Sequence, residues 1–412
     1  MQQQTSRRRS YQVSFSVVKD TFEQIREVVE LQLRGSALSM LQGLFSEEVG
    51  RLCGPRYSRK QGQAAYRAGS DPGSVLLRGQ RVGIRRPRVK QGGQEVALET
   101  YGALQGFDLL CERVMKHMLC GVSTRNYEPL LDEISGGLGL SRSSVSKAFV
   151  QGSRQALEEL NGRDLSSFEW LAVMIDSIEC VDRSITVALG ITTRGKKIVM
   201  GLREGDTENA ELCKDLLQSL IERGFPLDAP ILFVLDGSKA LRKAVRKVFG
   251  DQVPIQRCIR HKERNALSYL PKSHHLEFRR RWKMIHGLAR YDEAKRELDR
   301  LIDWLMRICP GAAKSVEEAA GETLTVARLQ TPAKLRTTLL STNPIESPFD
   351  GVRSRSARVK NWKSGPDQIA RWVAASLLDV EKRFRAIMGY REIPVLLGQL
   401  NKLSLIQERQ VA

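Results

Sequence analysis

The chain has 412 residues, which is long enough for two or three domains with hydrophobic cores of their own. Its 66 lysine and arginine residues outnumber its 47 acidic residues, and the formal net charge of +19 favours a polyanionic partner such as nucleic acid over a merely solvated basic surface. The sequence has no apolar run that could span a bilayer, no secretory signal and no CxxC pair among its seven cysteines, which predicts a cytoplasmic protein with reduced thiols and no membrane partner.

The first 70 residues are predicted to be mainly helical, because apolar side chains recur at helical spacing from Phe22 onward. In residues 71–104, valine and isoleucine alternate with arginine between glycine-containing steps, a pattern typical of a short β-ribbon with a basic face. Residues 51–100 carry 11 lysines and arginines against three acidic residues, and this local density favours DNA contact over arginines that merely face water. The candidate DNA contacts in this ribbon are Arg81, Arg85, Arg86 and Arg88.

Residues 105–165 return to a helical pattern and contain helix-turn-helix spacing. A first helix should end at a Gly-Gly step, and a second helix should begin after the capping residue Ser141. Val145 and Phe149 would pack the second helix on the first, which leaves Arg142 and Lys147 facing outward as candidate DNA contacts. Many helical hairpins share this spacing without touching DNA, so that alternative stays open.

From residue 166 three strand-like runs follow one another, and then come a helix, a short apolar strand, another helix and another short strand. The helix after the third strand is expected to be capped by Asp206 or Thr207. The order β-β-β-α-β-α-β predicts an α/β fold with an RNase H-like core. In such a core the sheet is mixed, the first three strands are antiparallel, and helices cover both faces.

We expect this catalytic domain to combine residues 166–262 with residues 341–390. Residues 263–340 lie between the two parts, show apolar side chains only at helical spacing, and are too long for a simple loop. They predict an all-helical insertion into the catalytic domain. Residues 391–412 are interpreted as a C-terminal tail.

Two acidic residues stand at the ends of apolar strand-like runs, Asp176 after "LAVMI" and Asp236 after "ILFVL". Aspartate is a poor strand former and is rarely buried without a partner. If the two strands are neighbours, the carboxylates converge, and a hard divalent cation such as Mg²⁺ or Mn²⁺ would relieve their repulsion. The structural alternative is that each aspartate simply ends its strand, for which the Asp-Gly turn at Asp236 is the stronger case.

Glu346 is the third candidate, in the stretch "STNPIES". Locally it resembles a helix-capping residue, with Asn343 as the cap, Pro344 at the first helical position and Glu346 at the third. Pro348 should delay or bend this helix. However, a helix that follows the fifth strand of such a core can carry a carboxylate toward the strand ends. The basic residues beyond it are candidate phosphate clamps, namely Arg353, Arg355, Arg358 and Lys360.

Cys258 and His261 form a Cys-x-x-His pair directly after the last short strand. Such a pair is half of a zinc site, but the chain has no convincing second pair, so zinc is disfavoured. The alternative is a structural role, and the residues alone leave the role of the pair open.

The chain resembles the Mutator-type transposases of bacterial insertion sequences, which belong to the DDE class. The resemblance rests on the order of Asp176, Asp236 and Glu346, on "CIRH" followed by "KERN", and on "STNPIES" followed by an arginine-rich helix. It implies that the three acids are the catalytic triad and hold two divalent ions, Mg²⁺ or Mn²⁺, with Asp176 as the bridging ligand. It also implies a helical insertion between the second aspartate and the glutamate, and it suggests that Cys258 and His261 help to position DNA close to Asp236.

The implied activity is cleavage of DNA at the terminal inverted repeats of an insertion sequence, followed by attack of the freed 3′-OH on target DNA. The implied partners are double-stranded DNA and further copies of the chain, in a bacterial, nucleoid-associated setting. Two alternatives remain, a nuclease on the same core that cuts without joining and a catalytically silent DNA-binding regulator. Strand transfer separates the first from a transposase, and metal-dependent cleavage separates the second.

Overall fold

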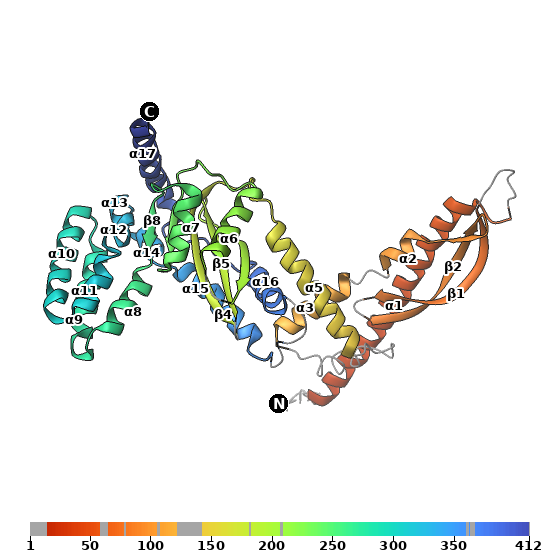
Figure 1. Ribbon diagram of the computed structural model, residues 1–412. Helices are drawn as coiled ribbons and strands as arrows, with labels where there is room; N and C mark the ends of the chain where they lie inside the picture. The colour runs from red at the N-terminus through yellow and green to blue at the C-terminus, as the bar shows by residue number, and fades with distance from the viewer. Residues whose placement is uncertain are drawn as a thin grey trace, which may run out of the picture. The chain divides into compact units, whose positions relative to one another are not determined.

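The computed structural model describes residues 15–57, 65–77, 80–104, 108–121, 142–180, 183–206, 209–359, 362 and 367–411. The chain divides into two compact units (Figure 1). The first comprises Met1–Leu110 with Glu128–Ser141, and the second comprises Cys111–Tyr127 with Arg142–Ala412. Helix α3 (Asp108–Leu119) crosses the boundary between the units in the sequence, because Leu110 is assigned to the first unit and Cys111 to the second.

The first unit combines a long helix with an antiparallel three-stranded sheet of order β1-β2-β3. Val89 of the sheet is fully buried with Phe45 and Val49 of the long helix, and these residues form the core of the unit. Its elements are α1 (Phe15–Cys53), β1 (Ala65–Leu77), β2 (Gln80–Gln91), β3 (Gln94–Val96) and α2 (Glu99–Leu104). The predicted β-ribbon is therefore present, and it begins a few residues earlier than the sequence pattern indicated.

The second unit contains a five-stranded mixed sheet of order β6-β5-β4-β7-β8. The first three strands of this sheet pair antiparallel, and β7 and β8 run parallel to β4, as the sequence predicts. Its elements are α5 (Arg142–Gly162), β4 (Trp170–Cys180), β5 (Arg183–Thr192), β6 (Lys197–Gly205), α6 (Ala210–Glu222), β7 (Leu232–Leu235), α7 (Lys239–Phe249) and β8 (Ile255–Arg257).

Helices cover both faces of this sheet, so its central strands are buried on both sides. On one face, Val173 and Ile175 of β4 pack against the apolar sides of α6 and α7. On the other face, Met174 and Ile178 pack against α15 (Asn343–Ser356), α16 (Gln368–Glu381) and α5. The alternation along β4 therefore assigns successive side chains to separate cores.

Among the described residues between β8 and α15, all regular elements are helices. Most of these helices pack together around a hydrophobic core that is separate from the cores of the sheet. Trp282 and Phe278 stack near the centre of this core, with ring centroids 5.6 Å apart. The helices are α8 (Ile259–Tyr269), η1 (Lys272–His274), α9 (His275–Gly287), α10 (Tyr291–Ile308), α11 (Pro310–Glu317), α12 (Ala320–Thr323), α13 (Thr325–Arg328) and α14 (Ala333–Leu339).

The end of the chain is helical and belongs to the core of the sheet. After η2 (Tyr390–Glu392), α17 (Ile393–Val411) buries Ile393, Leu396 and Leu400 in the same cluster as α15 and α16. The sequence alone indicates only a C-terminal tail for this segment. Its first half contributes to the fold.

Two predicted helix starts are wrong in detail. The cap of α6 is Asn209, whose side chain accepts the N–H of Leu212 at 2.9 Å, and not Asp206 or Thr207. The cap of α15 is Thr342, so Asn343 is the first helical residue. Pro348 does not delay α15 but lies inside it, and the burial of Pro348 and its neighbours offsets the lost hydrogen bond.

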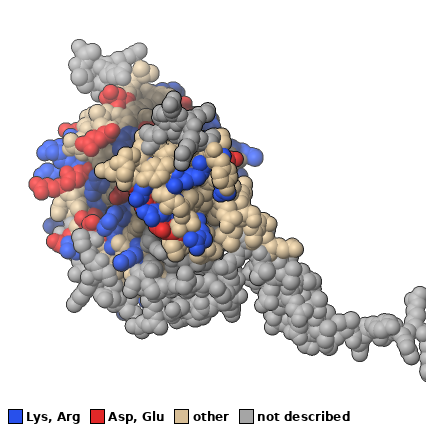
Figure 2. Space-filling view, turned by 90° about the vertical axis from the view of Figure 1, so that its right-hand side faces the viewer, with Lys and Arg blue, Asp and Glu red and all other residues tan. Residues whose placement is uncertain are grey.

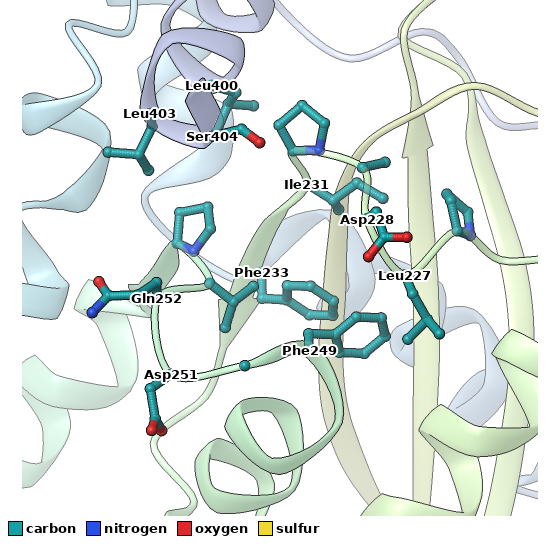
Figure 3. A pocket seen from close by; sticks show the side chains of 16 residues that line it. Leu227, Asp228, Ile231, Phe233, Phe249, Asp251, Gln252, Leu400, Leu403 and Ser404 are labelled. Carbon is teal, nitrogen blue, oxygen red and sulfur yellow. The ribbon is translucent and has the colours of Figure 1, made fainter. Parts of the chain in front are cut away.

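A pocket of about 320 Å³ lies at the amino end of β7 (Figure 3). Phe233 and Phe249 line it side by side, and Leu400 and Leu403 of α17 face it from the other side. Asp236 follows the opposite, carboxyl end of β7, so this pocket is separate from the predicted acidic site. In the part of the chain that the structure describes, no helix has the length and apolar character needed to cross a membrane.

Candidate acidic site

The two predicted aspartates meet at one edge of the central sheet. β4 and β7 are parallel neighbours, and Ile175 pairs with Leu235. Asp176 and Asp236 are the next residues along the two strands, so the backbone brings them together as the sequence predicts. One detail differs, because β4 continues past Asp176 to Cys180. Asp176 therefore lies inside a strand and does not end it.

Asp176 is buried, with 5% of its surface exposed, and its two oxygens are used unequally. Oδ1 accepts the N–H of Ser177 at 2.9 Å, and Oδ2 has no hydrogen-bond partner among the described residues. Burial raises the pKa of Asp176 to about 6, the charge of Asp236 adds to the rise, and His261 opposes it. A buried carboxylate oxygen without a partner is costly, and a cation at this point would relieve that cost.

Asp236 stabilises the Asp-Gly turn that was the structural alternative to a metal-binding role. Its Oδ1 accepts the backbone N–H groups of Gly237 and, at 2.8 Å, of Ser238. Ser238 then caps α7 by accepting the N–H of Leu241 at 3.2 Å. These contacts use only one oxygen of Asp236. The turn therefore fixes the carboxylate beside Asp176 and leaves the other oxygen for a ligand.

Glu346 reaches the same region from the first turn of α15. Its carboxylate does not form the expected capping box with the backbone. Instead Oε1 accepts the hydroxyl of Thr342 at 3.3 Å and lies 3.9 Å from Nε2 of His261. Oε2 lies 3.9 Å from the guanidinium of Arg264, whose side chain is 64% exposed. Glu346 is thus surrounded by donors and cations at a partly open position.

Cys258 and His261 lie at the start of α8, directly after β8. A hydrogen bond that His261 donates to Cys258, together with the charges of Cys258, Asp176 and Asp236, raises the pKa of His261 to about 9. Burial raises the pKa of the Cys258 thiol, but the hydrogen bond and charge of His261 outweigh it and lower that pKa overall. A protonated imidazole therefore stands beside the carboxylates.

Cys258, His261 and Glu346 are the one group of three metal-binding side chains in the described residues whose ligand atoms all lie within 4.8 Å of one another. The hydroxyl oxygen of Thr342 lies 3.3 to 3.4 Å from a polar atom of each of them. The Thr342 hydroxyl therefore contacts all three of these side chains. Asp176, Asp236 and Glu346 do not meet the same distance together in the described structure.

The basic residues after Glu346, which were predicted to bind phosphate, differ in exposure and in their contacts within the protein. Arg353 is exposed and donates to Asp350 at 2.8 Å, whereas Arg355 is only 16% exposed and donates to Asp379 at 2.6 Å. Arg358 is exposed and donates to the carbonyl of Gly121 at 2.8 Å. Lys360 lies outside the described residues. Arg353 and Arg358 are therefore better placed for an external phosphate than Arg355.

The candidate DNA contacts in the ribbon also differ in how far their charges are paired with acidic residues of the protein. Arg85 is exposed and donates only to Ser70, within the described residues, whereas Arg86 and Arg88 each pair with Asp71 and Glu95. The side chain of Arg81 lies outside the described residues. On the face of the molecule drawn in Figure 2, lysine and arginine side chains are interspersed with acidic ones. The described part of that face therefore carries no single continuous basic patch.

The second helix of the predicted helix-turn-helix is α5, which begins at Arg142 as expected. Lys147 is exposed on it, and the side chain of Arg142 lies outside the described residues. Phe149 packs on Trp372 of α16, with ring centroids 4.5 Å apart, so α5 is anchored on α16. The expected first helix and turn fall in residues 122–141, outside the described residues.

Sequence reasoning missed three residues that shape the site. Thr342 contacts Cys258, His261 and Glu346, and Arg264 approaches Glu346 from solvent. Arg257 is buried and donates to the carbonyl of Gly237, next to Asp236, at 2.9 Å. Thr342 lies in the "STNPIES" stretch and Arg264 in "KERN", so both were within reach of the motifs. The partners of Arg257 could be found only from the fold.

Comparison with known proteins identifies the class, and the similar proteins are transposases of insertion sequences. The chain is 31% identical over 277 residues to the transposase for insertion sequence element IS6120 of Mycolicibacterium smegmatis, covering 65% of this chain and 83% of that protein. It is 25% identical over 385 residues to the transposase for IS256 in transposon Tn4001 of Staphylococcus aureus, covering 87% of this chain and 93% of that protein.

A third relative is the transposase for insertion sequence element ISRM5 of Rhizobium meliloti, which is 26% identical over 344 residues and 82% of each chain. The family described as "Transposase, Mutator family" matches residues 10–386. The match covers most of both compact units and all of the helical insertion. The chain belongs to the Mutator family of transposases.

Proposed function

We propose that this chain binds the terminal inverted repeats of an insertion sequence, cuts the DNA there and joins the freed end to target DNA. Its catalytic core would be RNase H-like, and Asp176, Asp236 and Glu346 would be its catalytic acids. The sheet order β6-β5-β4-β7-β8, with β4 at the centre and acids on β4 and after β7, supports this core. The relatives' transposase function supports the reaction class.

The observation that carries the proposal is the buried Asp176. Its free oxygen, beside Asp236 and within the field of His261, has no hydrogen-bond donor among the described residues. A structural aspartate would be expected to satisfy both oxygens or to lie at the surface. The arrangement is better explained by a divalent cation that binds when DNA does.

Asp176, Asp236 and Glu346 would hold two Mg²⁺ or Mn²⁺ ions, which when bound would activate the attacking oxygen and stabilise the leaving oxygen. The side chains of this protein have separate tasks. His261 and Arg264 present positive charge next to Glu346, where they can bind a phosphate oxygen of the DNA. The turn of Asp236 holds its carboxylate rigid, and the apolar cores on both faces of β4 fix Asp176.

The test uses the purified full-length chain, Mg²⁺, and labelled duplexes that end in the inverted repeats flanking the gene. Wild type should cleave at the repeat end and, with a target plasmid present, yield joined products. Glu346→Gln and Asp176→Asn should lose cleavage by about 10³-fold or more while keeping DNA affinity, because each removes a charge that holds metal. The matched control is Asp350→Asn, an exposed acid on the same helix, which should retain activity.

Equal cleavage by wild type and Glu346→Gln would return Glu346 to a structural role and refute the acidic trio. Cleavage without joined products would favour a nuclease on the same core. Binding without metal-dependent cleavage, unchanged in Asp176→Asn, would favour a DNA-binding regulator.

A further inference from the structure

Thr342 is the point at which the sheet, α8 and α15 meet. It is fully buried and precedes α15 as its cap. Its hydroxyl oxygen lies 3.4 Å from Sγ of Cys258, 3.4 Å from Nδ1 of His261 and 3.3 Å from Oε1 of Glu346. One hydroxyl thus contacts three chemically active side chains.

A hydroxyl has one proton to donate and two lone pairs to accept, so these contacts cannot all be equivalent. The sulfur of Cys258 has a second donor, because the backbone N–H of Thr342 also points at it at 3.4 Å. His261 can donate its Nδ1 proton to the hydroxyl oxygen. The hydroxyl proton is then free for the carboxylate of Glu346, which is the strongest acceptor within reach.

We propose that Thr342 is a positioning residue that orients Glu346 for the divalent cation, and that Cys258 and His261 fix the orientation of its hydroxyl. This assigns the Cys-x-x-His pair a role, namely to hold Thr342 from the side of the sheet. The inference rests on the proposed function. The geometry disfavours a zinc ion bound by Cys258, His261 and Glu346, because the Thr342 hydroxyl lies within 3.4 Å of an atom of all three.

The decisive variant is Thr342→Val, which keeps the shape of the side chain and removes the hydroxyl. Thr342→Ser restores a hydroxyl and is the conservative rescue. Thr337→Val is the matched control, since the Thr337 hydroxyl is exposed on α14 and donates only to the carbonyl of Ala333 in the described structure. Each protein is assayed as the full chain bound to its repeat-end DNA.

The first readout is Mn²⁺ affinity of the DNA complex, measured by electron paramagnetic resonance titration without turnover. The second is the Mg²⁺ concentration that gives half-maximal cleavage. Thr342→Val should lower the Mn²⁺ affinity and raise the half-maximal Mg²⁺ concentration, each by about tenfold or more, as outer-shell changes at metal sites do. Thr342→Ser and Thr337→Val should stay within about twofold of wild type. DNA affinity should be unchanged throughout, which separates positioning of a metal ligand from general damage.

Thermal unfolding shows whether Thr342→Val folds. If it does not, Cys258→Ala provides the second test, because it removes the sulfur that holds Thr342, and it should weaken Mn²⁺ binding in the same direction. Wild-type Mn²⁺ affinity in these variants would overturn the proposal while leaving the proposed function intact. A wild-type protein that copurifies with zinc and loses it in Cys258→Ala would also overturn it. If wild type neither binds Mn²⁺ nor cleaves DNA, both proposals fail.

Discussion

His286 on α9 is a buried histidine in the core of the helical insertion. Neither of its ring nitrogens has a hydrogen-bond partner among the described residues, and the ring lies edge-on to Trp282 with centroids 4.4 Å apart. Burial lowers the pKa of His286 to about 3, so the native ring is neutral. Below pH 6.5 the unfolded chain binds a proton that the folded chain does not, so folding stability falls as the pH falls.

We therefore predict that His286→Leu weakens the acid sensitivity of the protein. Between pH 7.5 and pH 5 the histidine should cost wild type about 2 kcal/mol of unfolding free energy, at about 1.4 kcal/mol per pH unit below 6.5. The measurement is thermal or urea unfolding of both proteins across this range. His274→Leu, at a half-buried site nearby, is the control. Parallel pH profiles for wild type and His286→Leu would contradict this account.

The joint between the helical insertion and the sheet is a cluster of ion pairs. Glu322 of α12 accepts from Arg257 of β8 at 3.0 Å and from Arg246 of α7 at 3.0 Å. Glu318 accepts from Lys262 of α8 at 2.9 Å. Arg257 is almost fully buried and also holds the carbonyl of Gly237, so the insertion is tied to the turn that carries Asp236.

Glu322→Gln should therefore destabilise the protein by about 2–4 kcal/mol, because it leaves the buried charge of Arg257 without its main counterion. The matched control is Glu297→Gln, which breaks the exposed pair with Arg300 on α10 and should cost less than about 0.5 kcal/mol. Urea unfolding of the two variants gives the comparison. A loss in Glu322→Gln no larger than in the control would mean that the joint is held by apolar packing alone.

Local patterns predicted the strands and most helices well, because apolar runs such as residues 170–176 and 231–235 have few other ways to be buried. The neighbouring positions of Asp176 and Asp236 followed from the chain order of those strands. The start of α15 did not follow, because Asn343 and Thr342 are both acceptable caps and tertiary packing decides between them. The partners of Arg257 and Thr342 come from distant segments, and no local rule selects them.

The charge of the chain is large, but much of it is already paired within the fold. On the ribbon, Arg88 lies 3.3 Å from Asp71 and 3.2 Å from Glu95, whereas Arg85 has no acidic partner in the described residues. Binding to DNA releases counterions only for charges that reach phosphates. The number of lysine and arginine side chains that can contact DNA phosphates is therefore smaller than the net charge of +19 implies.

We predict that Arg85→Ala weakens DNA binding and reduces the slope of log affinity against log salt concentration by about 0.9, the value for one phosphate contact. Arg88→Ala on the same strand should change the slope less, because its charge is compensated within the protein. Fluorescence anisotropy of a labelled duplex at several salt concentrations measures both. Equal slopes for wild type and Arg85→Ala would remove Arg85 from the DNA interface.

The third acid lies beyond the entire helical insertion, in α15. A ribosome therefore synthesises Asp176 and Asp236 well before Glu346, and on the proposed function a nascent chain lacks its third acid until α15 is made. Products that end before residue 343 also lack α15 and α16, whose side chains cover one face of the sheet. On the proposed function such fragments have no third metal-binding acid and cannot cut DNA.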